Sequence, residues 1–191
     1  MSKLIRLAFI SFICTLLLAC SKPAFQGTDI SQSQIGGGFS LIDHHGQLKT
    51  LADYQGKVVV LFFGYTSCPD VCPTTMAELR NTMSELGEAA KDVQVLFISV
   101  DPERDTTQLL SQYVPAFHPS FIGLTGNKSQ IDAATKNYRA IYQKQGQGNN
   151  YLVDHTAGSY LIDRKGNTRV LVNYGAGAAT FTHDIQLLLA D

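Results

Sequence analysis

The chain has 191 residues, and its 15 lysines and arginines nearly balance its 16 aspartates and glutamates, giving a net charge of -1. It contains no cluster of basic residues, which argues against a nucleic-acid-binding protein. Hydrophobic residues make up 45% of the sequence, enough to bury one core in a domain of this size.

The first residues have the pattern of a secretory signal peptide. Lys3 and Arg6 give a basic start, and the apolar run over residues 7–18 is too short for a confident membrane-spanning helix. The run ends in Leu-Leu-Ala-Cys20, which resembles a bacterial lipobox. We therefore expect residues 1–19 to be a lipoprotein signal peptide and Cys20 to be lipidated, giving a membrane-anchored lipoprotein that faces the periplasm or the cell exterior. An uncleaved N-terminal anchor is the alternative.

A linker-like segment follows, and regular secondary-structure elements begin after it. Residues 20–38 are polar and end in three glycines, so we expect a flexible tether, followed by a folded domain over residues 39–191. A short hairpin is expected from residues 39–42 and 48–51. Residues 58–63 are apolar without interruption, which predicts a central strand covered on both faces.

The rest of the chain alternates helices and strands. The predicted elements are a helix over 74–90, a strand over 93–100, a helix ending at 114, a strand over 121–124, a helix over 129–138, a strand over 140–144, a loop over 145–150, a hairpin from 159–163 and 169–173, and a helix over 180–190. This order predicts a single α/β domain with a mixed central sheet flanked by helices. A cysteine pair after the first long strand makes the expected fold thioredoxin-like.

Cys68 and Cys72 lie between the strand over 58–63 and the following helix. Cys14 leaves with the signal peptide and Cys20 is expected to carry lipid, so Cys68 and Cys72 are the only free thiols of the mature domain. In an oxidising compartment such a pair forms a disulfide or binds a metal. Residues four apart lie on one face of a helix, and the helix N-terminus favours a thiolate, so both sulfurs could bind one ion.

Two sulfurs rarely complete a metal site, so a histidine is expected as the third ligand. In thioredoxin-like folds, the segment before the final hairpin runs beside the cysteine loop, and His155 lies in that segment. Ala157 stands about where thiol–disulfide enzymes carry a cis-proline, and no proline follows Pro119. The remaining histidines are expected in exposed turns, in a loop or on a solvated helix face: His44, His45, His118 and His183.

Two thiolates and one imidazole suit Cu(I), whereas zinc would need a fourth ligand. Asp70 and Asp154 could lend one, although we expect carboxylates beside thiolates to act on the ligands from outside the coordination sphere. Asp101 could orient the cysteine loop. Within residues 104–106, we expect Arg104 to pair with a carboxylate, and residue 105 or 106 to cap the next helix.

Three blocks of sequence resemble the Sco (SenC) family. They are Gly-Tyr-Thr-Ser-Cys-Pro-Asp-Val-Cys-Pro at residues 64–73, Asp-Pro-Glu-Arg-Asp-Thr at 101–106, and Asp-His at 154–155 followed by Tyr-Leu-Ile-Asp at 160–163. The resemblance covers residues 39–174, and Ser67 stands where many members have histidine. It implies a membrane-tethered, thioredoxin-like copper protein that supports assembly of the dinuclear copper centre of cytochrome c oxidase. Its copper ligands map onto Cys68, Cys72 and His155.

The leading hypothesis is therefore delivery of copper, as Cu(I) or Cu(II), to the copper-bearing subunit of cytochrome c oxidase. Another copper chaperone or a thioredoxin-like reductant could be a further partner. The alternative is a thiol–disulfide reductase that keeps the cysteines of the oxidase subunit reduced for metal loading, so enzymatic activity stays open. A thiol peroxidase-like redox sensor is a weaker third hypothesis, because the mature chain has no separate resolving cysteine beyond this pair.

Overall fold

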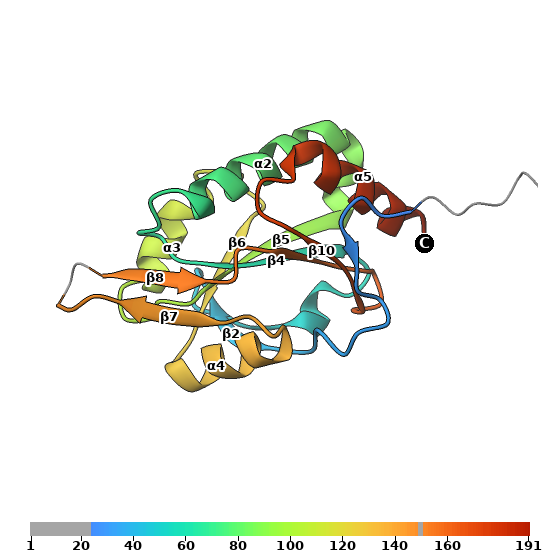
Figure 1. Ribbon diagram of the computed structural model, residues 1–191. Coiled ribbons are helices and arrows are strands. Elements are labelled where there is room, and N and C mark those ends of the chain that lie inside the picture. The colour runs from blue at the N-terminus through green and yellow to red at the C-terminus, as the bar shows by residue number, and fades with distance from the viewer. Residues whose placement is uncertain (1–23, 149–150) are drawn as a thin grey trace, which may run out of the picture.

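The computed structural model describes residues 24–148 and 151–191 (Figure 1). Within these ranges, one mixed sheet of eight strands has the order β1-β10-β9-β4-β5-β6-β2-β3, and β7 and β8 form a separate two-stranded sheet. The strands are β1 (Thr28–Asp29), β2 (Ser40–Asp43), β3 (Leu48–Thr50), β4 (Val58–Gly64), β5 (Val93–Ser99), β6 (Ile122–Thr125), β7 (Tyr142–Gln145), β8 (Leu152–His155), β9 (Ser159–Ile162) and β10 (Thr168–Val172).

Helices cover both faces of the large sheet. The α-helices are α2 (Val71–Leu86), α3 (Thr107–Tyr113), α4 (Lys128–Asn137) and α5 (Gly177–Ala190), with short 3-10 helices η1 (Leu51–Tyr54) and η2 (Gly87–Asp92). Helices α2 and α5 lie side by side over one face and α4 lies below the other (Figure 1). The predicted α/β fold with a mixed central sheet flanked by helices is confirmed.

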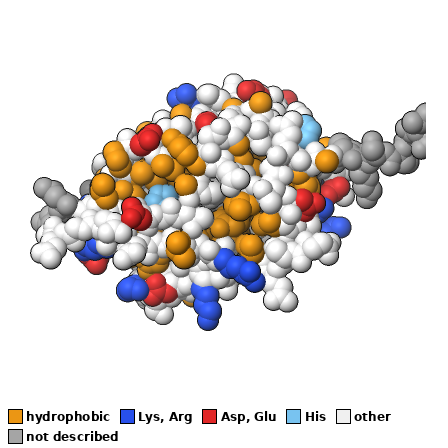
Figure 2. All heavy atoms as spheres, viewed as in Figure 1, with side chains coloured by type: hydrophobic (Ala, Val, Ile, Leu, Met, Phe, Trp, Pro, Cys, Tyr) orange, Lys and Arg blue, Asp and Glu red, His pale blue; other side chains and the backbone are white. Residues whose placement is uncertain are grey.

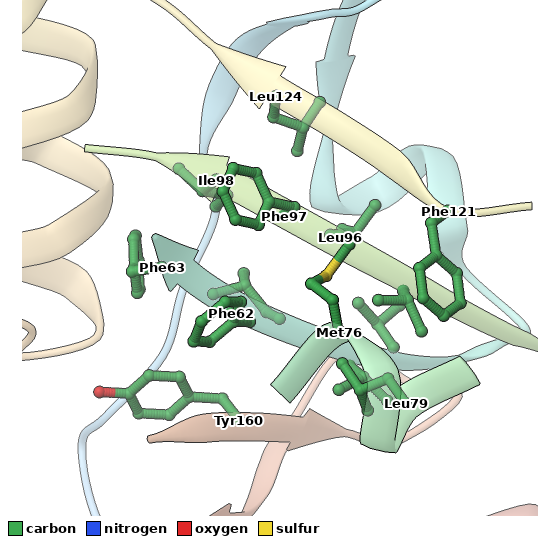
Figure 3. Packing of buried hydrophobic residues seen from close by; sticks show 14 of the residues in the cluster. Phe62, Phe63, Met76, Leu79, Leu96, Phe97, Ile98, Phe121, Leu124 and Tyr160 are labelled. Carbon is green, nitrogen blue, oxygen red and sulfur yellow. The ribbon is translucent and has the colours of Figure 1, made fainter. Parts of the chain in front are cut away.

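The centre of the sheet is formed by β4, which pairs in parallel with β5 and antiparallel with β9. Every residue of β4 and β5 is buried, as the uninterrupted apolar runs predict. Side chains alternate across a strand, so neighbouring residues face different layers. Met76 and Leu79 of α2 lie against β4 and β5 on one side (Figure 3), and Phe63 meets the ring of Tyr138, just after α4, at 5.8 Å between centroids. Burying one such side chain contributes about 1.5–3 kcal/mol.

The N-terminal segment joins the fold earlier than the sequence predicts. The backbone amides of Gln26 and Gly27 each donate to the buried carboxylate of Asp184 in α5 at 2.8 Å. Strand β1 then pairs antiparallel with β10. The expectation of a flexible tether over residues 20–38 is therefore wrong from Gln26 onward, because a carboxylate on the last helix and an edge strand hold this segment.

Two further boundaries differ from the prediction around the cysteines and His155. Helix α2 begins at Val71, three residues before the predicted start, and it ends at Leu86, where η2 takes over. Strand β8 was not expected at all. It pairs antiparallel with β7, and Tyr142 lies opposite His155. Figure 1 shows this β7–β8 ribbon projecting from one end of the molecule.

The predicted signal peptide and Cys20 lie outside the described residues. In the part of the chain that is described, none of the helices has both the length and the hydrophobicity needed to cross a membrane.

Candidate metal centre

The cysteine loop connects β4 to α2 at the carboxyl end of the central strands. The amide of Cys68 donates to the carbonyl of Tyr65 at 3.2 Å, which closes a turn, and Cys72 lies in the first turn of α2. Cys68 is partly exposed and Cys72 is fully buried. The prediction that both cysteines share one face of a helix is wrong, because Cys68 precedes the helix and the turn directs its side chain.

Gly64, the last residue of β4, lets α2 start close to the sheet. A Cβ atom at this position would lie 2.9 Å from Sγ of Cys72 and 2.7 Å from the ring of Phe97. Any larger residue would have to displace one of them. The absence of a side chain at Gly64 therefore determines where the buried sulfur lies.

His155 ends β8 and faces the two cysteines. Its Nε2 atom lies 3.6 Å from Sγ of Cys72, and the ligand atoms of Cys68, Cys72 and His155 all lie within 4.8 Å of one another. Metal bonds of about 2.0–2.3 Å place the ligands of a three-coordinate ion about 4 Å apart. The three residues thus fit around one metal ion, and the structure brings the predicted ligands together.

The imidazole of His155 is oriented for metal binding. Its Nδ1 atom lies 3.0 Å from the carbonyl oxygen of Thr156, which can only accept, so Nδ1 carries the proton. The lone pair of Nε2 then points at the sulfurs. Burial lowers the pKa of His155, against opposing effects of the Thr156 carbonyl and of Asp154, and so favours the neutral, ligating form.

Two aromatic rings enclose the imidazole. Tyr65 meets it edge-on at 5.8 Å between centroids with an interplanar angle of 89°, and Phe62 meets it at 6.2 Å and 68°. Both rings come from β4 or from the residue that follows it. They hold the ring of His155 in place and keep water from its inner side.

The thiol of Cys72 is neutral in the metal-free protein. Burial raises its pKa, the thiol of Cys68 raises it further, and a hydrogen bond from the backbone amide of Tyr65 opposes both effects. The expected thiolate stabilisation at the helix N-terminus is therefore outweighed by desolvation. A metal ion that binds here must displace the proton of Cys72.

Asp101 lies beside the centre but does not contact the ligands. Its buried carboxylate accepts the hydroxyl of Tyr151 at 2.6 Å and pairs with Arg104. Arg104 also donates to the carbonyl of Tyr151 at 3.0 Å and stacks on its ring at 3.7 Å. The predicted pairing of Arg104 is confirmed. Asp101 thus orients the segment that leads into β8, rather than the cysteine loop.

The other two predicted carboxylates lie on the rim. Asp70 is exposed and accepts weak hydrogen bonds, both at 3.4 Å, from Thr74 and Tyr174. Asp154 is also exposed and accepts from Gln145 at 2.8 Å. Neither carboxylate hydrogen-bonds to a ligand side chain, and the imidazole of His155 is oriented by the backbone carbonyl of Thr156 instead.

Sequence reasoning missed the role of Asp105. Thr106, not Asp105, caps α3, since its hydroxyl accepts from the amide of Leu109 at 3.2 Å. The carboxylate of Asp105 is fully buried and accepts from Thr66 in the cysteine loop and from Ser99 at the end of β5. This contact depends on the parallel pairing of β4 and β5, which places both loops at one edge of the sheet and which no local sequence signal showed.

The remaining histidines lie away from the three ligands. His44 is buried and its Nδ1 accepts from the amide of Gly123 at 3.0 Å, so the expectation of an exposed turn residue is wrong for His44 and holds for His45. His118 lies in a loop and bonds to Ser120. His183 is partly exposed, with 35% of its side chain accessible, and its Nδ1 lies 2.8 Å from the carboxylate of Asp184.

A shallow hollow opens the centre to solvent. Cys68 and His155 line it, together with the apolar side chains of Pro69, Val71, Leu152 and Ala157. Figure 2 shows hydrophobic side chains gathered around a histidine at the end of the molecule from which the β7–β8 ribbon projects. Among the described residues no peptide bond is cis.

Fold and site together define a thioredoxin-like protein with a candidate soft-metal centre of two cysteines and one histidine. The family model described as SCO1/SenC matches residues 27–190, and the chain belongs to this family.

Individual relatives agree with this assignment. An SCO2-like protein of Rickettsia prowazekii is 40% identical over 136 residues, which cover 70% of this chain and 66% of that protein. Arabidopsis thaliana ScoI, solved with copper bound, superimposes with a TM-score of 0.77 at 37% identity over 82% of this chain and 99% of that one. BsSco, described as a member of the Sco family of cytochrome c oxidase assembly proteins, shares the fold with a TM-score of 0.66 at 21% identity over 89% of this chain and 98% of that one.

Proposed function

We propose that this protein binds one copper ion through Cys68, Cys72 and His155. The observation that carries the proposal is the convergence of the three ligand atoms within 4.8 Å. Two sulfurs and an oriented imidazole form a donor set for Cu(I), which accepts low coordination numbers and soft ligands. Copper in the related Arabidopsis structure supports the choice of metal.

The function we propose for the bound ion is delivery to the copper-bearing subunit of cytochrome c oxidase during assembly of its dinuclear copper centre. Thiolates of the subunit would replace Cys68, Cys72 and His155 one at a time, so that each copper–ligand bond that breaks is matched by one that forms. The partly exposed Cys68 lies at the mouth of the hollow and is the natural first point of exchange. The description of BsSco as a member of a family of cytochrome c oxidase assembly proteins supports the choice of target.

We further propose that residues 1–19 are removed as a signal peptide and that lipid on Cys20 holds the domain at the outer side of a cytoplasmic membrane. Residues 21–25 would then connect the lipid to a domain that begins at Gln26, where Asp184 holds the chain. Such an anchor would keep the metal centre within reach of a membrane-embedded oxidase.

The test is metal analysis of protein purified under reducing conditions, followed by transfer. Near-stoichiometric copper in the wild type is expected, together with loss of that copper to the metal-free soluble domain of an oxidase subunit. A matched receiver that lacks its cysteine ligands should take no copper. Metal-free protein that also fails to bind added Cu(I) would overturn the proposal.

A second function is favoured by the unequal exposure of the two thiols. A thiol–disulfide reductase needs an exposed attacking cysteine and a shielded second one, and Cys68 and Cys72 differ in this way. In such a reaction Cys68 attacks a disulfide of the partner, and Cys72 then releases the partner as a dithiol while the Cys68–Cys72 disulfide forms. Stoichiometric reduction of an oxidised subunit peptide by reduced, metal-free protein, with formation of the Cys68–Cys72 disulfide, would favour this alternative.

A further inference from the structure

Asp105 has the most enclosed carboxylate beside the cysteine loop. Its side chain is fully buried and accepts three hydrogen bonds: the amide of Thr66 at 3.0 Å, the hydroxyl of Thr66 at 2.6 Å and the hydroxyl of Ser99 at 2.6 Å. All three donors are neutral groups that point at one charged acceptor. Hydrogen bonds to a charged acceptor are stronger than those between neutral groups.

These bonds connect two loops that lie far apart in the sequence. Thr66 is a central residue of the turn from Tyr65 to Cys68, and Ser99 is the last residue of β5. The hydroxyl of Ser99 in turn accepts from the amide of Asp101 at 3.0 Å. One buried carboxylate therefore holds the turn before Cys68 against the end of the neighbouring strand.

The two cysteines depend on this carboxylate to different degrees. Cys72 is fixed by α2 and by its contact with Gly64, whereas Cys68 precedes the helix and takes its position from the turn. A change in the turn would therefore move the sulfur of Cys68 more than that of Cys72, which the helix also holds.

We propose that Asp105 is a positioning residue for Cys68: by holding Thr66 and Ser99, its carboxylate keeps the sulfur of Cys68 within bonding reach of an ion held by Cys72 and His155. This inference rests on the proposed metal function and adds to it a residue that touches neither the ion nor its ligands. Asparagine at this position has the same shape but no charge, so the hydrogen bonds that join it to Thr66 and Ser99 would all be weaker, neutral ones. The turn would then lose part of its anchorage.

The matched control is Asp163, another buried aspartate that holds a turn. It accepts from the amides of Lys165 and Asn167 at 3.0 and 2.9 Å in the β9–β10 hairpin. This hairpin follows Ile162, which pairs with Val59 near the start of β4, so Asp163 lies at the opposite edge of the sheet. Asp105→Asn and Asp163→Asn should both lower the melting temperature.

Only Asp105→Asn should weaken Cu(I) binding, measured by competition with a chromophoric chelator, by about tenfold, which corresponds to about 1.4 kcal/mol. Wild-type affinity in Asp105→Asn, or an equal loss in Asp163→Asn, would overturn the proposal. Thr66→Ser keeps the hydroxyl and should bind copper like the wild type, whereas Thr66→Val should bind it more weakly. This pair tests the same bonds if Asp105→Asn fails to fold.

Combining Asp105→Asn with Cys68→Ser distinguishes an effect on copper binding through Cys68 from a general effect on stability. In the Cys68→Ser background, Asp105→Asn should still lower the melting temperature but should not weaken the residual copper binding any further. An additional loss of affinity in that background would show that Asp105 does not act through Cys68.

The disulfide equilibrium tests the inference without copper. In the equilibrium to be measured, the thiols of Cys68 and Cys72 give up two protons and two electrons and form a disulfide. One glutathione disulfide takes them up and becomes two glutathione thiols. The equilibrium constant should fall at least threefold in Asp105→Asn and stay within about twofold of the wild type in Asp163→Asn. If the wild type binds no copper, the proposed function fails while this measurement still decides the role of Asp105. An unchanged constant in Asp105→Asn would overturn that role.

Discussion

Nε2 of His155 lies 3.6 Å from Sγ of Cys72, although 83 positions separate the two residues in the chain. The sulfur is held by the first turn of α2 and the imidazole by the end of β8. Their meeting depends on the central sheet, which positions both elements at the carboxyl edge of β4.

Replacing His155 with alanine should remove one of three copper ligands without disturbing the core. We expect Cu(I) affinity to fall by at least about a hundredfold, since even indirect changes around metal ligands cost 10–100-fold. The melting temperature and the ability to form the Cys68–Cys72 disulfide should be retained. Chelator competition measures the affinity, and His118→Ala, in a loop at a distance from the three ligands, is the control. Equal affinities for the two variants would assign the third ligand elsewhere.

Single replacements of the cysteines separate delivery from reduction. A metal centre needs both sulfurs, so Cys68→Ser and Cys72→Ser should each abolish tight copper binding. A reductase would instead behave asymmetrically: Cys72→Ser would trap a mixed disulfide with the partner through Cys68, and Cys68→Ser would trap nothing. Copper content and non-reducing electrophoresis report the two outcomes. We expect both variants to lose copper and neither to trap a partner. A mixed disulfide in Cys72→Ser alone, together with activity that does not depend on copper, would falsify copper delivery.

Copper affinity should increase as the pH rises. The raised pKa of Cys72 means that its thiol gives up a proton when metal binds, so protons compete with the ion throughout the neutral range. The imidazole of His155 adds a second competing proton only below its ordinary pKa of about 6.5, because burial lowers the pKa of this side chain. Copper affinities measured at three pH values between 6 and 8 should be lower at the more acidic values. A profile that does not change with pH would mean that Cys72 is already a thiolate in the metal-free protein.

The stability of the metal-free protein should depend on pH through the same two groups. The pKa of His155 is lowered on folding, so its contribution is present above the unfolded value of about 6.5 and is lost as the pH falls below it. The pKa of Cys72 is raised, so its contribution is present below the unfolded value of about 8.5 and is lost as the pH rises above it. Urea unfolding should therefore show a loss on the acid side that His155→Gln reduces, and a loss on the alkaline side that Cys72→Ser reduces.

Gly64→Ala should move the buried sulfur. Its Cβ would meet Sγ of Cys72 and the ring of Phe97, and such overpacking costs about 1–3 kcal/mol. We expect a lower melting temperature together with weaker copper binding. Gly38→Ala is the control, because a Cβ there meets nothing within 4 Å. Full copper affinity in Gly64→Ala would show that the sheet does not constrain Cys72.

Cys20→Ser should release the protein from the membrane or leave it uncleaved. The reason is the Leu-Leu-Ala-Cys junction at residues 17–20, which is expected to direct both cleavage and lipid attachment. Membrane fractionation and mass spectrometry of the intact protein measure both. If the serine variant stays membrane-bound and the wild type carries no acyl chains, the lipoprotein interpretation is wrong.

The parts of the structure that could be predicted depend on local signals. The uninterrupted apolar runs identify β4 and β5, and the helical spacing after Cys72 identifies α2 to within a few residues. The ligands could be chosen because thiols and imidazole are scarce and chemically distinctive, and because the expected order of elements places His155 beside the cysteine loop.

The parts that could not be predicted depend on contacts between distant residues. Asp105 bonds to Thr66 across 39 positions, and Asp184 binds Gln26 across 158. Neither aspartate differs, in the sequence alone, from an ordinary residue near a helix end or on a helix face. His44 was likewise assigned to an exposed turn, because its partner Gly123 lies on a different strand. Burial of a polar side chain is decided by the partner that it finds, and the sequence does not display that partner.

Within the described residues, β7 and β8 pair only with each other, so His155 belongs to a ribbon with no strand pairing to the large sheet. The two cysteines belong to the body of the domain. An ion bound to all three residues would be a reversible cross-link between the β7–β8 ribbon and the body of the domain. Loading would stiffen the ribbon further, so we expect slower amide hydrogen exchange in β7 and β8 when copper is bound.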